Sequence, residues 1–174
     1  MNFLSIFFPG VWVHEFAHAL ACFIGGVKVH RVNVRSSSGV VVHDPTNARN
    51  AWIITLAPLL MGTLLGALCI HAAKNAWGAN TLLSFVLIWL GISIGFHAIP
   101  STTDALNIPQ AISRRFAEAV NSPHSFGWKL IKILGYVLTW PLAWLSASII
   151  WLANLTILFR LAWVVGIVLL TWPA

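Results

Sequence analysis

Charged side chains are scarce in this sequence. Only 8% of its 174 residues are Asp, Glu, Lys or Arg, whereas about a quarter of the residues of an ordinary soluble domain are charged. Hydrophobic residues make up 59% of the chain, and long apolar runs recur along it. This composition excludes a typical soluble domain. We therefore expect an integral membrane protein whose surface mostly contacts membrane lipid.

Cysteines and acidic residues are also few. Cys22 and Cys69 both fall in apolar runs, so neither a disulfide framework nor a C-x-x-C metal site is indicated. The basic residues give a formal net charge of +6 but are scattered between apolar runs, which predicts no nucleic-acid partner and is typical of topology signals. A carboxylate ligand or general base must come from one of four residues: Glu15, Asp44, Asp104 and Glu118.

Apolar runs of about 20 residues, the length that crosses a bilayer, lie at 3–24, 51–73 and 81–99. A longer stretch, 128–172, would measure roughly 68 Å as one helix, so we expect two spans that divide near Asn154. We predict an all-α polytopic membrane protein with about five transmembrane helices, four being the alternative. The whole chain, 1–174, is expected to form a single domain with its core at 1–110.

Two connections between the runs have patterns of their own. Residues 27–43 hold β-branched residues on both sides of a Ser-Ser-Ser-Gly turn, which predicts a small β-hairpin between the first two spans. Residues 105–121 carry apolar side chains on one side, which predicts an amphipathic helix lying in the membrane interface.

The positive charges predict an orientation. The first and third loops hold four basic residues each, and the second loop holds Lys74 alone. By the positive-inside rule the first and third loops are cytoplasmic and the N-terminus lies outside. The residues counted are Lys28, Arg31, Arg35 and Arg49, then Arg114, Arg115, Lys129 and Lys132.

The first apolar run contains His14-Glu15-Phe16-Ala17-His18. On a helix, this spacing places two imidazoles on one face, where both can reach one Zn²⁺. Glu15 is then positioned to take a proton from a zinc-activated water. Ionisable side chains at membrane depth are costly and mark function, although a polar pair that stabilises helix packing is the alternative.

A catalytic zinc takes three protein ligands and leaves one position open. Asp104 follows the third apolar run, which by the charge pattern ends on the same side of the membrane as the run bearing His14 and His18. Asp104 can therefore reach the metal, or it can cap the helix that follows. His97 is the competing third ligand; otherwise it is a residue that orients a ligand, or a structural one.

At these residues the chain resembles the site-two protease family of intramembrane zinc metalloproteases. H-E-x-x-H lies in a first core span, and His97-x-x-Pro100 before Asp104 is similar to the family's Asn-x-x-Pro turn and ligand aspartate. Leu56-Ala57-Pro58 is similar to the family's small-residue-plus-proline element. The resemblance covers about residues 1–110. It departs at His97 and Ala105, so we expect a minimal, divergent member without a PDZ or CBS domain.

The resemblance implies a zinc-dependent intramembrane endopeptidase with one Zn²⁺ per chain and an active site toward the cytoplasm. His14, His18 and Asp104 would hold the metal, and Glu15 would be the general base. The substrate would be a transmembrane or membrane-associated protein, unwound and paired with a strand edge of the hairpin. The substrate-binding residues suggested on this basis are Val40, Val41, Val42 and Pro58, the last through a kink that opens a water path or merely bends the helix for packing.

Two other functions compete with a protease. One is a catalytically silent zinc-binding scaffold or chaperone, against which the presence of Glu15 argues, because zinc binding alone does not require it. The other is a metal transporter, against which the lack of an internal repeat argues. The sequence predicts no particular oligomeric state and no substrate identity.

Overall fold

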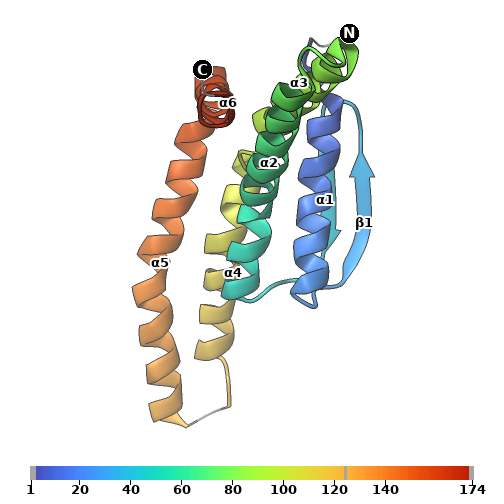
Figure 1. Ribbon diagram of the computed structural model, residues 1–174. Helices are drawn as coiled ribbons and strands as arrows, with labels where there is room; N and C mark the ends of the chain where they lie inside the picture. Colours follow the sequence, from blue (N-terminus) through green and yellow to red (C-terminus); the bar gives the residue numbers. More distant parts are fainter. Residues whose placement is uncertain (1–2, 124, 173–174) are drawn as a thin grey trace.

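The computed structural model describes residues 3–123 and 125–172. A 3₁₀ turn, Phe3–Phe7, leads into helix α1, Phe8–Ile24, and a two-stranded hairpin follows. Four further helices lie side by side with α1 or with one another, and α6 sits near one end of the bundle (Figure 1). The elements after α1 are β1 (Val29–Val34), β2 (Gly39–His43), α2 (Ala48–Ala76), α3 (Thr81–Phe96), α4 (Thr102–Val120), α5 (Phe126–Asn154) and α6 (Ile157–Thr171).

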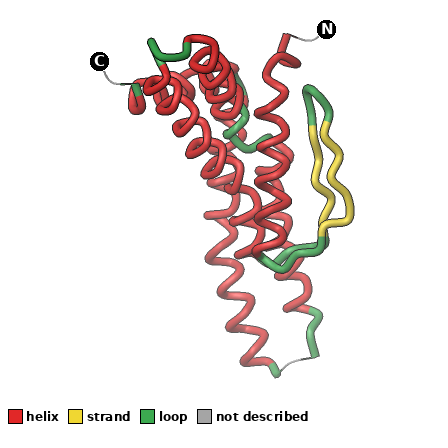
Figure 2. The backbone as a smooth tube through the Cα atoms, turned by 45° about the vertical axis from the view of Figure 1, so that its right-hand side comes forward, coloured by secondary structure: helices red, strands yellow, loops and turns green. Residues whose placement is uncertain are grey.

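The hairpin predicted over residues 27–43 is confirmed. Helix α1 ends at Ile24 with Gly25 as its C-cap, and Gly26 adopts a φ of +65°, a backbone conformation that glycine reaches without strain. The chain then forms two antiparallel strands in which Val32 pairs with Val41. The hairpin runs along α1 with its turn toward the N-terminal half of that helix (Figure 1, Figure 2).

Helices α2 and α3 approach each other closely through small residues. A β-carbon added at Gly62 would lie 2.8 Å from the Ala98 side chain, and one at Gly91 would lie 2.7 Å from Ile70. Small residues at such contacts let membrane helices pack backbone to backbone. Pro58 lies inside α2 without ending the helix.

Helices α3 and α4 both pack against α2, one after the other along its length. Helix α3 packs against the C-terminal half of α2 through the glycine contacts, and α4 packs against its N-terminal half, where Ala51 joins a buried cluster with Ile108 and Ile112. Thr55 of α2 donates a hydrogen bond to the Asp104 carbonyl at 3.2 Å. The loop between α3 and α4 therefore lies beside the middle of α2, deep among the helices.

The last two helices pack on the outside of the others: α5 lies against α4, and α6 lies against α2 and α3. Helix α5 packs along α4 through Ala143, Ala147 and Ile150, and α6 returns to α2, where Trp163 donates a hydrogen bond to Thr63. The expected division near Asn154 is confirmed, because α5 ends at that residue.

The expectation of five spans is not confirmed. Among the described residues, three helices are long and apolar enough to cross a membrane: Ser5–Ile24, Ala48–Ala76 and Phe126–Asn154. Helices α3 and α6 are apolar but have 16 and 15 residues, or roughly 24 and 22 Å, less than a hydrocarbon core of about 30 Å. The mostly helical architecture with one small hairpin is confirmed. The interfacial placement of α4 stays a prediction.

Candidate metal centre

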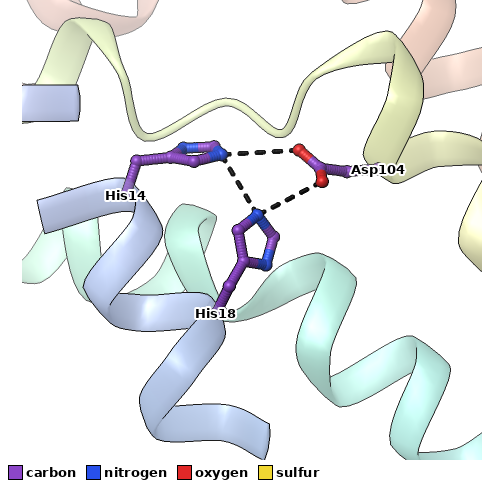
Figure 3. A group of neighbouring side chains, drawn as sticks. All are labelled: His14, His18 and Asp104. Carbon is purple, nitrogen blue, oxygen red and sulfur yellow. Dashed lines mark hydrogen bonds and ion pairs between the residues drawn. The ribbon is translucent and has the colours of Figure 1, made fainter. Parts of the chain in front are cut away.

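His14 and His18 lie one turn apart on α1, and their side chains converge toward one another and toward Asp104 (Figure 3). Their Nε2 atoms are 3.2 Å apart. The side chain of His18 is buried and that of His14 is nearly so, with 11% exposed. The i, i+4 spacing therefore brings both ring nitrogens to one point, as the sequence predicted.

Backbone carbonyls fix the protonation of both imidazoles. His14 donates from Nδ1 to the His97 carbonyl at 2.6 Å, and His18 donates from Nδ1 to the Ile54 carbonyl at 2.8 Å. A carbonyl oxygen only accepts, so each Nδ1 carries the hydrogen. In the neutral ring Nε2 then has a free lone pair, and this is how proteins orient histidines that bind metals.

Asp104 faces the two histidines from the first turn of α4. Its Oδ2 lies 3.4 Å from His14 Nε2, and its Oδ1 lies 3.3 Å from His18 Nε2. Oδ2 also accepts hydrogen bonds from the Ser101 backbone N–H and hydroxyl, while the Ser101 hydroxyl accepts from the Asp104 N–H. Asp104 is not the N-cap residue, since Ser101 holds that position, but Asp104 does help to cap α4 because its side chain completes a capping box.

The surroundings of Asp104 keep it ionised. Burial alone would raise the pKa of its carboxyl, but hydrogen bonds with His14, His18 and Ser101 hold that pKa well below its usual range. A carboxylate and two Nε2 atoms thus face one another, with all three ligand atoms within 4.8 Å. A metal cation between them would displace the imidazole protons that now bond to the carboxylate.

The donor set fits zinc. Two imidazole nitrogens and one carboxylate oxygen are ligands that Zn²⁺ takes in catalytic sites, where a fourth position stays open. These three residues form the one group of at least three His, Cys, Asp or Glu side chains, within the described part of the chain, that could hold a metal.

Glu15 lies under the start of β2, the second strand of the hairpin. Its side chain is buried, and a β-carbon added at Gly39 would overlap Glu15 Cγ, so the hairpin backbone rests directly on this side chain. Glycine is required at this close approach. Glu15 also borders the same cavity as His14 and His18.

The cavity beside the cluster has a volume of about 460 Å³. One wall is the hairpin, through its turn and β2, with no contribution from the described residues of β1. The opposite wall is the α3–α4 loop and the start of α4, and Arg160 of α6 also borders the cavity. Val40 and Val41 line it, whereas Val42 is exposed and lies outside it.

His97 stands beside the cluster without joining its three side chains. It serves His14 through its backbone carbonyl, while its ring Nδ1 contacts the Ser93 carbonyl at 3.1 Å. Pro58 is fully buried in α2 and does not line the cavity.

The sequence predicted local turn hydrogen bonding for Ser101 but not its capping box, and it predicted no role for Arg160. The pattern Ser101-x-x-Asp104 is a capping box, and it could have placed the start of α4 at Thr102. Arg160 is a lone charged residue in an apolar stretch, a feature that marks function in membrane helices.

A helix-borne H-E-x-x-H, completed by an aspartate from a second segment among apolar helices, defines the class of membrane metallopeptidases. The chain belongs to the Peptidase M50B-like family, whose model matches residues 8–100. The matched range holds α1, the hairpin, α2 and α3, and the resemblance to site-two proteases is thereby confirmed. Membership indicates a metalloprotease and, with the apolar helices, an integral membrane protein. No curated protein and no solved structure matches the chain.

Proposed function

We propose that the protein is a zinc-dependent intramembrane endopeptidase. One observation carries the proposal: the three donor atoms converge within 4.8 Å, and Glu15 borders the same cavity. Two of the donors and Glu15 come from a helix that is apolar enough to cross a membrane. Polar groups at such depth are retained for function.

In peptide hydrolysis, the side chains and backbone of the protein supply a general base and hold the metal ligands in orientation. Zinc bound by His14, His18 and Asp104 would polarise a peptide carbonyl and lower the pKa of water toward about 7. The Glu15 carboxylate then takes a proton from the attacking water and delivers it to the nitrogen of the departing amine. The His97 and Ile54 carbonyls hold the two imidazoles in the required orientation.

The hairpin supports an extended substrate. Peptide bonds in a helix are hydrogen-bonded and shielded, so a substrate helix must unwind before hydrolysis. A strand edge next to the cavity offers backbone hydrogen bonds to such an extended segment, and β2 borders the cavity while β1 does not. Substrates are therefore transmembrane or membrane-associated proteins.

The orientation remains part of the proposal. The basic loops favour an outside N-terminus and a cytoplasm-facing centre. The hairpin lies in the first of these loops, so unwound substrate would enter from the cytoplasmic side.

The test is a reconstitution of the wild type and Glu15→Gln in lipid vesicles. Zinc per chain is measured on each sample, together with cleavage of a panel of membrane-spanning peptides. We expect about one zinc in both proteins and cleavage by the wild type alone. Zinc-replete wild type that cleaves no peptide would contradict the protease and favour a scaffold.

A further inference from the structure

Arg160 is a charged residue of α6 that borders the metal cavity and is partly buried. Its guanidinium donates from Nη1 to the Phe96 carbonyl at 3.0 Å and from Nη2 to Asn154 Oδ1 at 2.6 Å. It also lies 5.7 Å from the centre of the Phe96 ring. Asn154 in turn donates from Nδ2 to the Pro100 carbonyl at 2.8 Å.

Arg160 makes no close ion pair within the described residues, and the Asp104 carboxylate acts on its charge from a longer distance. The ion pairs between described residues involve His14, His18, His30 and Arg115, and none involves Arg160. A partly buried charge without a close ion pair is costly, most of all among apolar helices. The energetic cost indicates that the contacts it makes are needed.

These contacts reach both ends of the α3–α4 loop, whose residues hydrogen-bond to two of the proposed metal ligands. Phe96 and Pro100 stand at its two ends, and between them lies His97, whose carbonyl accepts the hydrogen bond from His14 Nδ1. Directly after Pro100 comes Ser101, which binds the Asp104 carboxylate through its hydroxyl at 2.7 Å. The position of this loop therefore sets the orientation of two of the three ligands.

We propose that Arg160 and Asn154 are positioning residues for the metal centre, which clamp the α3–α4 loop in the conformation that holds His14 and Asp104. The inference rests on the proposed metal site. It adds residues from the end of α5 and from α6, both outside the range that the family model matches. Groups that orient ligands in this way typically change metal affinity about 10- to 100-fold when removed.

The test is a titration of metal-free, full-length protein in detergent with Zn²⁺, and with Co²⁺ for its visible absorption spectrum. The variants are Arg160→Gln and Asn154→Asp, which keeps an acceptor for Arg160 but loses the donor to Pro100. Both should bind metal about 10-fold more weakly or worse, with an altered Co²⁺ spectrum. Arg160→Lys, which retains one donor for the Phe96 carbonyl, should recover part of the affinity.

Trp163→Phe is the matched control. It removes a different tertiary hydrogen bond of α6, to Thr63 of α2 at 3.1 Å, and should leave the affinity and spectrum of the wild type. Wild-type affinity and spectrum in folded Arg160→Gln or Asn154→Asp would overturn the clamp while leaving the proposed function intact. Wild type that binds neither metal would overturn the clamp and the proposed function together.

Discussion

At the scale of single residues, the two histidines owe their role to backbone carbonyls as much as to their own spacing. The His97 and Ile54 carbonyls take the Nδ1 hydrogens and leave both Nε2 atoms facing Asp104. A metal cation would displace the protons between these atoms. The arrangement therefore supports the proposed metal site over a polar pair that only stabilises packing.

Asp104→Asn separates the capping role from the ligand role of this residue. An asparagine oxygen can still accept the hydrogen bonds from Ser101, but the negative charge at the cluster is lost. We expect a folded protein whose Zn²⁺ affinity falls at least 10-fold. Calorimetric titration of metal-free protein with Zn²⁺ measures this.

His97→Ala is the companion variant. Since His97 serves His14 through its backbone carbonyl, the substitution should leave Zn²⁺ affinity within a few-fold of the wild type. Loss of zinc in His97→Ala together with its retention in Asp104→Asn would show that the imidazole is the third ligand.

The sequence predicted the three candidate metal ligands but not the residues that position them. The convergence of His14 and His18 follows from helix geometry, and Asp104 followed from the predicted topology together with the family resemblance. The contacts of Arg160 with Phe96 span 64 residues. No local pattern encodes such a pairing, so only the fold reveals it.

At the scale of elements, the register of the hairpin decides which backbone N–H and C=O groups of β2 are free to bind a substrate strand. The Arg35 N–H donates to the Ser38 carbonyl next to the turn, and hydrogen-bonded and non-hydrogen-bonded pairs alternate in an antiparallel ladder. Asn33 and Val40 then form a bonded pair, whereas Val32 and Val41 do not. The N–H of Val41 therefore points away from β1.

Val41→Pro should impair substrate pairing selectively. Proline removes the outward N–H without breaking a bond to β1, so cleavage of membrane peptides should fall at least 10-fold while zinc content stays unchanged. Val41→Thr keeps the N–H and a similar shape, and should cleave like the wild type. Equal rates for the proline and threonine variants would refute pairing through this strand.

The hairpin was predictable because β-branched residues flank a Ser/Gly turn. Which of Val40, Val41 and Val42 has a free N–H was not, because register depends on the paired strand. The sequence also could not predict that α3 and α4 pack on the two halves of α2. It results from contacts such as Gly62 with Ala98, between residues far apart in the chain.

At the scale of the whole molecule, the polar groups of the centre join four helices. α1 supplies two of the proposed ligands, α4 supplies the third, α2 contributes the Ile54 carbonyl, and α6 contributes Arg160. A metal bound at this junction would stabilise the bundle as a whole, by an amount set by the free metal concentration and Kd.

Removal of zinc with a chelator should lower the thermal stability of the purified protein. At free zinc about 1,000 times Kd the metal contributes about 4 kcal/mol, which corresponds to roughly 10 °C in Tm for a chain of this size. Asp104→Asn, whose zinc affinity is weakened, should show a much smaller shift. An equal shift in both proteins would mean that the chelator acts elsewhere.

The proposed activity requires Glu15 to act as the base beside a bound zinc. Its most direct test is the single-turnover rate of one membrane-spanning peptide with wild type and Glu15→Gln, each carrying one measured zinc per chain. General-base catalysis contributes about 10²- to 10⁴-fold, so we expect Glu15→Gln to be slower by at least 100-fold. Equal rates at equal zinc content would contradict the account.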